Sequence, residues 1–544
     1  MNTISIIGTT PVVLGFFFQK HTKKTRDQGS GRMIKESEMK RQIVFIMTDT
    51  TRKDMLGCYG DERMKTPNLD RLAEEGIRYE QAYCVQPVCG PARSALFTGT
   101  FPHSNGVVTN CVPLFDNVKN LGQRLSDNGI KTGYTGKWHL DGGDYFGSGI
   151  CPDGWDPEIW YDMHTYLLEL SEKERIRSRR SETAYDSDWT SEMTYAHRVS
   201  DKAIVFLEKH KDSDFFLAVS YDEPHGPFIC PAPFNTMYDG FVFEDTPDYR
   251  DDLKDKPLLQ RLWAGEDLNK TSEQLRSPSK MLSLYLGCNS FVDSQIGRVI
   301  EKVQALAPDA LIIFTSDHGD MLGSHRLQGK NAAFYKEITN IPFIIRPAVR
   351  TEKNTGIVVT YPASHIDVTP TVLDYFDIPV PKLLEGKSML AQIEDPSIRI
   401  NQEVFCEFTR YEIDHDGFGG LQMMRAVTDG RYKLTINLMD TDELYDLQTD
   451  PFEVNNLIGD ERYTQIRNSL HDRLLEHMNR TRDLYRGYQW GCRSWRNDKQ
   501  PTWQNSGFTR QREHEEYEER QWDYDTGLPM VEAVRNKLLY DVKR

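Results

Sequence analysis

The stretch from Cys89 to Gly99 combines residue types that could do chemistry. It reads Cys-Gly-Pro-Ala-Arg-Ser-Ala-Leu-Phe-Thr-Gly. Pro91 is suited to open a helix and Gly99 to end it, so Cys89 would lie at the helix N-terminus, where free N–H groups favour negative charge. Arg93, four residues on, would add a fixed cation on the same side. The spacing fits an anion-stabilising reactive site, and it fits equally a structural cysteine before an ordinary helix.

Two acidic residues follow apolar runs of the kind that form buried strands. Asp49 comes just after the run 43–47 (IVFIM), and Asp317 just after the run 311–315 (LIIFT). Ligands of open α/β sheets gather beyond the carboxyl ends of the strands. Both carboxylates are therefore expected to face one crevice.

The elements that must position these residues alternate between strand and helix. Further buried strands are predicted at 215–220 and 342–345, and long helices near 191–210 and 281–306. A shorter helix is predicted from Thr66, with Thr66 as N-cap, Pro67 as its first residue and Gly76 as its stop. This order predicts an α/β fold with a large mixed, mostly parallel sheet between two layers of helices.

The pattern changes after about residue 385. An Asp-Gly turn at 429–430 between alternating segments predicts a hairpin, 443–447 predicts a strand, and 462–480 a helix. We therefore expect an N-terminal extension (1–40), a catalytic domain (41–385) and a smaller C-terminal subdomain (386–544). That subdomain would hold an antiparallel sheet with a helix and end in a tail rich in aromatic residues.

Composition excludes several classes of protein. The 544 residues include 66 basic and 82 acidic side chains, a net charge of -16, which argues against general nucleic-acid binding. A mean hydropathy of -0.60 argues against a membrane transporter. The nine cysteines have neither zinc-ligand spacing nor the density of a disulfide scaffold.

The N-terminus allows two interpretations. Residues 3–18 are apolar, but no Lys or Arg precedes them, and a basic cluster follows from Lys20 to Arg26. This order is the reverse of a usual signal peptide. The segment is either a degenerate export signal or tether, giving a periplasmic or secreted protein, or an extension of a cytoplasmic protein that starts at Met39.

The Cys-X-Pro-X-Arg pattern, with the Ser-Ala-Leu-Phe-Thr-Gly that follows, resembles the signature of the type I, formylglycine-dependent sulfatases of the alkaline phosphatase superfamily. The resemblance extends over roughly residues 42–480 through ordered blocks. In chain order these are Asp49 with Leu56-Gly57-Cys58-Tyr59-Gly60, Thr66-Pro67-Asn68-Leu69-Asp70, Gly136-Lys137-Trp138-His139, Glu223-Pro224-His225, Ser316-Asp317-His318-Gly319, and the Leu-Tyr-Asp-Leu and Asp-Pro pieces within 444–451. The resemblance implies that a formylglycine-generating maturation enzyme oxidises Cys89 to formylglycine.

The family mechanism gives these residues roles. The hydrated aldehyde attacks sulfur with one hydroxyl while a metal lowers its pKa, and the alcohol leaves. The second hydroxyl then loses its proton and sulfate is released. By resemblance, Asp49, Asp317, His318 and the matured residue 89 hold the divalent metal.

Two departures from the family pattern bear on the metal. Many relatives have a second Asp where this chain has Thr50, and Asn where it has His318; branches related to phosphonate and phosphodiester hydrolases have similar substitutions. Ca²⁺ is favoured on family grounds, whereas an imidazole ligand and fewer carboxylates suit Mn²⁺ or Zn²⁺.

The resemblance also assigns the residues that handle sulfate and the leaving group. Lys137 and His139 lie two apart in an extended segment and share one face; Lys137 would contact sulfate and His139 a hydroxyl of residue 89. His225 would protonate the leaving group. Lys330 would be a second sulfate-binding lysine, with Lys336 as a substitute.

His325 and Arg326 lie close enough in sequence to Lys330 to line the entrance of the site and contact substrate. An exposed structural role explains them equally well. The insertion at 141–195 could frame the substrate with aromatic and basic side chains, because aromatic rings suit sugar faces and arginines suit anions. Those side chains are Trp155, Trp160, Arg175, Arg177, Arg179 and Arg180. A solvated helix surface explains the arginines equally well.

Three functions compete. The first is a sulfatase that releases sulfate from a sulfated carbohydrate or an aryl sulfate. The second is a phosphonate monoester or phosphodiester hydrolase with the same nucleophile and metal site. The third, a binding module on an inactive scaffold, predicts loss of Cys89, Asp49 or Asp317, and all three are present. The sequence leaves the oligomeric state open.

Overall fold

The computed structural model describes residues 40–142, 145–412, 420–496 and 527–528. Residues 1–39 of the predicted extension, and with them the export signal, lie outside the described residues, as does most of the predicted tail. Among the described residues, no helix combines the length and the apolar character needed to cross a membrane.

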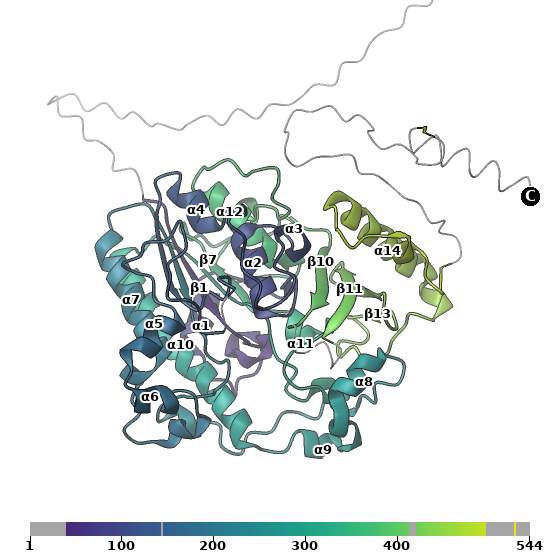
Figure 1. The fold of residues 1–544 in the computed structure, drawn as a ribbon, viewed down its shortest axis with the longest axis horizontal. Coiled ribbons are helices and arrows are strands. Elements are labelled where there is room, and N and C mark those ends of the chain that lie inside the picture. The colour runs from purple at the N-terminus through teal and green to yellow at the C-terminus, as the bar shows by residue number, and fades with distance from the viewer. Residues whose placement is uncertain (1–39, 143–144, 413–419, 497–526, 529–544) are drawn as a thin grey trace, which may run out of the picture. The chain divides into compact units, whose positions relative to one another are not determined.

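Within the described part of the chain, the main sheet has seven strands in the order β4-β5-β1-β6-β7-β2-β8. Figure 1 labels β1 and β7 of this sheet. They are β1 (Gln42–Thr48), β2 (Ile77–Tyr79), β4 (Lys131–Gly136), β5 (Phe215–Ser220), β6 (Leu311–Ser316), β7 (Phe343–Arg346) and β8 (Ile357–Val359). Strands β4, β5, β1 and β6 are parallel to one another, whereas β7 is antiparallel to both of its neighbours. The predicted mixed, mostly parallel sheet is confirmed.

Helices cover both faces of this sheet. The main helices are α1 (Pro67–Glu74), α2 (Cys89–Thr98), α4 (Leu121–Ser126), α7 (Tyr195–His210), α10 (Lys280–Leu306) and α12 (Val368–Tyr375). Further helices are α3 (Pro102–Asn105), α5 (Met163–Glu169), α6 (Glu172–Arg177), α8 (Leu258–Ala264), α9 (Ser272–Leu275), α11 (Lys336–Thr339) and α13 (Leu390–Glu394). Strands β3 (Ala82–Tyr83) and β9 (Ala363–Ser364) form a separate two-stranded pair.

The side chains of β1 alternate between two hydrophobic cores, as the period of a strand requires. Val44 and Ile46 pack into the core that contains α1, α7 and α10. Phe45 and Met47 pack on the opposite side, in the core that contains α2, α4 and α12. A fully buried side chain of this kind stabilises the fold by about 1.5–3 kcal/mol. Because both faces are covered, the strand reads as a continuous apolar run in the sequence.

The register of the parallel strands brings their carboxyl ends to one edge of the sheet. Thr48 of β1 pairs with Ser316 of β6, and Ser220 of β5 pairs with Met47 and with Gly136 of β4. The segments that follow these four strands therefore emerge side by side, as expected for a ligand site of an α/β sheet.

A second, antiparallel sheet lies in the C-terminal part (Figure 1). Its strands are β10 (Val404–Arg410), β11 (Leu421–Thr428), β12 (Tyr432–Asn437) and β13 (Glu443–Asp446), followed by α14 (Thr464–Arg480) and α15 (Tyr488–Gly491). The predicted hairpin is β11–β12, with a left-handed Gly430 in its turn. Leu470 and Leu474 of α14 pack on Leu434 and Ile436 of the sheet. The predicted antiparallel sheet with a helix is confirmed.

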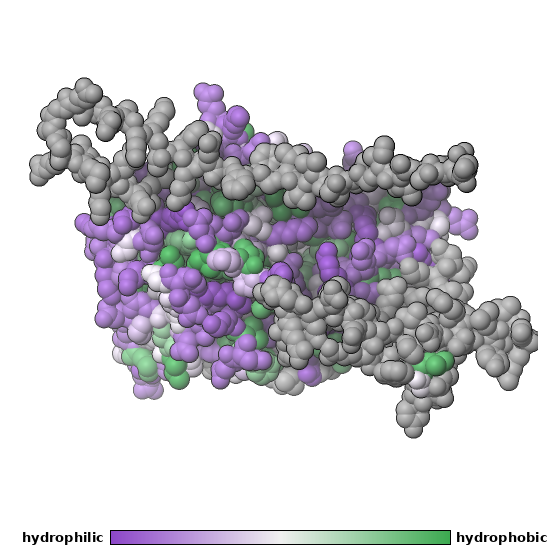
Figure 2. Space-filling model, turned by 90° about the horizontal axis from the view of Figure 1, so that it is seen from above, coloured by the Kyte–Doolittle hydropathy of each residue, from purple (hydrophilic) through white to green (hydrophobic). Residues whose placement is uncertain are grey.

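The surface of the described part agrees with the high content of charged residues. Figure 2 shows one face, on which the visible coloured residues are mostly hydrophilic and the hydrophobic ones lie in scattered groups. Scattered exposed apolar residues are normal for a folded protein and carry no functional information.

Candidate active site

Helix α2 begins at Cys89 and is buried along its whole length. It starts two residues before Pro91, the residue expected to open it. It ends at Gly99, whose φ of 70° is left-handed and whose N–H donates to the Ala95 carbonyl at 2.9 Å. Cys89 thus occupies the first turn, where the helix dipole favours negative charge.

Arg93, one turn later, ties two carboxylates together from inside the protein. Its Nη2 donates to Oδ2 of Asp49 at 3.2 Å, and its Nε donates to Oδ2 of Asp317 at 3.1 Å. The third nitrogen, Nη1, donates to the Lys137 carbonyl and to Ser220 Oγ. Since Arg93 binds the Oδ2 atoms, the Oδ1 atoms of both carboxylates remain for the site.

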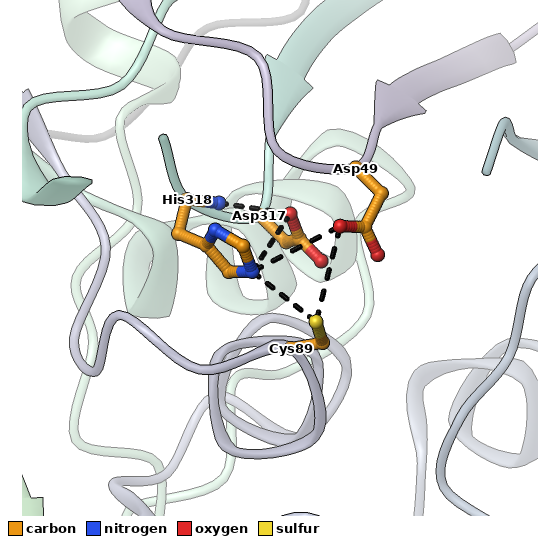
Figure 3. A group of neighbouring side chains, drawn as sticks. All are labelled: Asp49, Cys89, Asp317 and His318. Carbon is orange, nitrogen blue, oxygen red and sulfur yellow. Dashed lines mark hydrogen bonds and ion pairs between the residues drawn. The ribbon is translucent and has the colours of Figure 1, made fainter. Parts of the chain in front are cut away.

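Four side chains point toward one another where β1 and β6 end and α2 begins (Figure 3). Cys89 Sγ lies 3.2 Å from His318 Nε2 and 3.8 Å from Asp49 Oδ1. His318 Nε2 lies 3.9 Å from Asp49 Oδ1 and 3.7 Å from Asp317 Oδ1. Neighbouring ligands of a divalent cation with bonds of about 2.0–2.5 Å lie about 3–4 Å apart, so this donor set fits such an ion.

The hydrogen bonds of His318 prepare it as a ligand. Its Nδ1 lies 2.8 Å from the Gly319 carbonyl, which can only accept, so Nδ1 carries the proton. Nε2 then offers its lone pair to the cluster. In metal-binding histidines a hydrogen bond from the other ring nitrogen commonly fixes the tautomer in this way. Thr50 supplies no carboxylate; its Oγ1 donates to Asp49 Oδ1 at 2.6 Å.

Two lysines make the space around Cys89 positive. Lys330 Nζ donates to Cys89 Sγ at 3.0 Å, and Lys137 Nζ lies 2.7 Å from Asp49 Oδ2. Burial and Asp49 oppose ionisation of the thiol, but Lys330 and then Lys137 hold the pKa of Cys89 well below its usual value. The site is therefore built to hold an anion at residue 89, against the negative charge of the chain as a whole.

Lys336, the substitute considered for Lys330, is engaged elsewhere. Its Nζ donates to the Pro451 carbonyl at 2.6 Å and lies over the Phe452 ring. Lys330 is the lysine of this segment that reaches Cys89.

His225 and His139 flank Lys137 on the side of β4 and β5. Tyr145 lies between them, with its ring centroid 5.0 Å from that of His225 and 6.0 Å from that of His139. Burial and then Lys137 lower the pKa of His225 to about 4, so the imidazole is neutral at pH 7. His139 has a left-handed φ of 59° and follows the same strand end as Lys137.

The structure gives His325 and Arg326 partners outside this cluster. His325 is fully buried, with Nδ1 2.6 Å from Asp251 Oδ2 and its ring stacked on Tyr335 at 3.8 Å. Arg326 donates to the backbone carbonyls of Asp251, Asp267 and Lys270. Both side chains hold loops together, and these contacts argue against their expected role as substrate ligands.

The aromatic and basic side chains of the insertion are also used within the fold. Trp155 and Trp160 are only 5% and 6% exposed and belong to the core under α2. Arg177 pairs with Asp186 and Asp188. Arg179 lies over Phe146 and Tyr145. The expectation that these tryptophans frame the substrate is wrong, because they complete a hydrophobic core.

The sequence did not lead us to expect two residues of the site, Asp222 and Tyr145. Asp222 Oδ1 lies 3.1 Å from Lys137 Nζ and accepts from the Tyr145 hydroxyl at 2.5 Å. Asp222 is the second residue after β5, close to the end of a strand as Asp49 is after β1. Tyr145 lies in a loop whose sequence carries no comparable signal.

The site combines a reactive position at a helix N-terminus with metal donors beyond parallel strands and with lysines that suit an anion. These features are those of a metal-dependent ester hydrolase. Family comparison agrees. The sequence model described as Sulfatase matches residues 41–378, and that described as N-sulphoglucosamine sulphohydrolase, C-terminal, matches residues 323–480. The chain belongs to the sulfatase family of the alkaline phosphatase superfamily and is a sulfuric ester hydrolase.

Individual relatives agree with this assignment. The chain is 43% identical to the uncharacterized sulfatase YidJ of Escherichia coli K12, over 90% of this chain and 97% of that protein. It is 25% identical to an N-acetylglucosamine-6-O-sulfatase of Bacteroides thetaiotaomicron, over 82% of this chain and 88% of that protein. Its fold resembles the phosphonate monoester hydrolase of Agrobacterium radiobacter, with a TM-score of 0.68, 24% identity, and coverage of 81% and 96% of the two chains.

Proposed function

We propose that this sulfatase releases inorganic sulfate from a sulfated carbohydrate or an aryl sulfate, with residue 89 matured from cysteine to formylglycine. The observation that carries the proposal is the position of Cys89 Sγ, 3.0 Å from Lys330 Nζ and 3.2 Å from His318 Nε2. One atom of residue 89 thus touches both the cation suited to sulfate and the donor set suited to a metal.

In the proposed mechanism, Cys89 Sγ stands in for the oxygen atoms of the hydrated aldehyde. That hydrate supplies one hydroxyl as the nucleophile and a second whose deprotonation expels sulfate. A divalent ion held by Asp49, Asp317, His318 and residue 89 would acidify the hydroxyl and polarise a sulfate oxygen.

The chain's own residues do the remaining work. Lys330 and Lys137 bind the anionic oxygens of the ester, where charge grows in the transition state. Arg93 holds Asp49 and Asp317 in place through charge-assisted hydrogen bonds. His225 protonates the leaving oxygen; the negative charge of a bound sulfate favours the imidazolium that burial disfavours.

A carbohydrate substrate is supported by the relative named N-acetylglucosamine-6-O-sulfatase, which aligns over most of both chains. The likeness to a phosphonate monoester hydrolase concerns the fold, and substrates of both kinds belong in the test. A formylglycine-generating maturation enzyme is the implied partner.

The experiment compares matured enzyme and a Cys89→Ala variant on 4-nitrophenyl sulfate, N-acetylglucosamine 6-sulfate, a phosphonate monoester and a phosphodiester. We expect kcat/KM to be highest for a sulfate ester, and the variant to lose about 10³-fold or more on it, as for loss of a covalent nucleophile. A higher kcat/KM for the phosphonate or the phosphodiester would overturn the proposal in favour of the alternative hydrolase.

A further inference from the structure

Tyr145 lies at the centre of the residues proposed to act on the leaving group. It belongs to the segment between β4 and α5. Lys137 Nζ lies 4.0 Å from the centroid of its ring, a cation–π distance, and the His225 ring is 5.0 Å away. Tyr145 therefore contacts both a proposed sulfate-binding cation and the proposed proton donor.

The hydroxyl of Tyr145 joins Asp222 to His225. It donates to Asp222 Oδ1 at 2.5 Å and lies 3.0 Å from His225 Nδ1. Burial and then Asp222 raise the pKa of Tyr145 well above its usual value, so the phenol keeps its proton. That single proton points to the carboxylate, which can only accept, and the phenol oxygen is left to accept from His225.

A second acceptor fixes the same tautomer. His225 Nδ1 also lies 2.9 Å from the Gly226 carbonyl, which has no proton to give. With acceptors on both contacts, Nδ1 must carry hydrogen. Nε2 is consequently the nitrogen of His225 that can take up and release a proton.

We propose that Tyr145 and Asp222 are positioning residues, which hold His225 with Nδ1–H inward and stabilise its protonated form through the chain Nδ1–H···Oη–H···Oδ1. The consequence is activity on sulfate esters of alcohols that leave poorly, such as the aliphatic hydroxyls of sugars. This inference rests on the proposed function and refines its substrate class.

His225 supplies the proton that the leaving oxygen needs. The bond between sulfur and the ester oxygen breaks, its electron pair stays on that oxygen, and the oxygen takes the proton of His225 Nε2. Sulfur gains a bond to the oxygen of one hydroxyl of residue 89, whose proton has passed to solvent, and His225 becomes neutral. An aliphatic alkoxide is a poor leaving group and requires this proton. A nitrophenolate is a stable anion and leaves without it.

The aromatic ring has a packing role that can be separated from the hydroxyl. Arg179 lies over the ring at 5.7 Å, and Lys137 lies over it at 4.0 Å. Tyr145→Phe keeps both contacts and removes only the oxygen that links Asp222 to His225. Tyr161→Phe is the matched control, because the Tyr161 hydroxyl also donates to a carboxylate, Glu169 Oε2 at 2.6 Å, in the same insertion.

The test measures kcat/KM of matured wild type, Tyr145→Phe and Tyr161→Phe on aryl sulfates of rising leaving-group pKa, from 4-nitrophenyl to phenyl and 4-methylphenyl sulfate, and on N-acetylglucosamine 6-sulfate. For Tyr145→Phe we expect the loss of kcat/KM to grow with the pKa of the leaving group, and to be about 10- to 100-fold larger with the poorest leaving groups than with 4-nitrophenyl sulfate. Tyr161→Phe should follow wild type on every substrate.

Equal losses of Tyr145→Phe on all sulfates, or no loss on any, would overturn the role of Tyr145 while leaving the sulfatase proposal intact. A wild type that prefers a phosphonate monoester to every sulfate would instead overturn the proposed function, and the refinement with it. Turnover of 4-nitrophenyl sulfate by Tyr145→Phe also shows that the variant is folded.

Discussion

Lys330 and Cys89 are 241 residues apart in the sequence, yet Lys330 Nζ lies 3.0 Å from Cys89 Sγ. The contact joins the segment after β6 to the first turn of α2. It places a half-buried cation against the residue that we propose to become the nucleophile. Sulfate bound there would meet positive charge beside fully buried carboxylates, where each charge acts more strongly than in water.

Replacement of this cation should lower activity far more than replacement of its neighbour. For Lys330→Ala we expect kcat/KM with an aryl sulfate to fall by about 10²–10³-fold, because an electrostatic contact to the transition state is lost. Lys336→Ala, which removes a lysine that binds the Pro451 carbonyl on the surface, should change it by less than about twofold. Similar losses in both variants would show that Lys330 has no special contact with sulfate.

Metal removal should destabilise the protein. The carboxylates of Asp49 and Asp317 and the imidazole of His318 converge, so an ion bound in the folded state alone adds stability, about 2.7 kcal/mol at a metal concentration 100 times Kd. We expect chelation to lower the thermal unfolding midpoint and one of Ca²⁺, Mn²⁺ or Zn²⁺ to restore it. An unchanged midpoint after verified removal of metal would contradict the site.

Residue 318 should influence which metal is preferred. His318→Asn replaces an imidazole nitrogen with an amide oxygen, a harder ligand that suits Ca²⁺ better than Zn²⁺. We expect the ratio of Ca²⁺ to Zn²⁺ affinity, measured from the metal dependence of the unfolding midpoint, to rise in this variant. The same ratio in both proteins would mean that His318 is not a ligand.

Glu223 should make stability depend on pH. Burial and then Asp222 raise its pKa to about 7 in the folded protein. In the unfolded chain a Glu has a pKa of about 4.3. Between about pH 4.3 and 7 the folded state therefore keeps a proton on this carboxyl that the unfolded chain has released. The stability due to this group is present below that window and is lost as the pH rises through it.

Glu223→Gln should flatten this dependence. The variant should gain about 1–3 kcal/mol relative to wild type on going from pH 5 to pH 8, because its amide has no proton to lose. Thermal unfolding of both proteins at the two pH values gives the difference, in which other titrating groups cancel. Parallel pH profiles would contradict the raised pKa.

Gly136 determines how the chain leaves β4 toward Lys137. A Cβ at this position would lie 1.8 Å from the Ser220 carbonyl oxygen. The φ of Gly136 is 107°, in the left-handed region. Gly129→Ala is the control, since Gly129 also has a left-handed φ, of 79°, but nothing within 4 Å of a Cβ. We expect Gly129→Ala to cost about 1–2 kcal/mol, the strain of a left-handed residue, and Gly136→Ala to cost more and lower activity. Equal losses of stability in the two variants would contradict a role for the close contact between Gly136 and the Ser220 carbonyl.

The sequence predicted those parts of the site that depend on local pattern. Asp49 and Asp317 follow apolar strand runs, and parallel strands bring their ends together, so the carboxylates could be predicted to meet. The first turn of α2 likewise follows from Pro91 and Gly99, although the helix starts earlier, at Cys89.

Residues placed by long-range packing could not be predicted. His325 is close to Lys330 in sequence, but a left-handed φ of 53° and a hydrogen bond with Asp251 give it a buried position of its own. Trp155 and Tyr145 belong to one insertion, and only tertiary structure separates a core residue from a site residue. The composition of a loop does not encode which of its side chains turns inward.

The most direct test of residue 89 as a formylglycine nucleophile is the mass of the tryptic peptide 79–93, from protein co-expressed with a formylglycine-generating enzyme. Turnover of an aryl sulfate by the same sample and by Cys89→Ala accompanies it. We predict a peptide in which Cys89 has exchanged its sulfur and two hydrogens for one oxygen, alone or hydrated, and activity that the variant lacks. An unmodified cysteine despite a competent maturation enzyme, with equal activity in both samples, would contradict it.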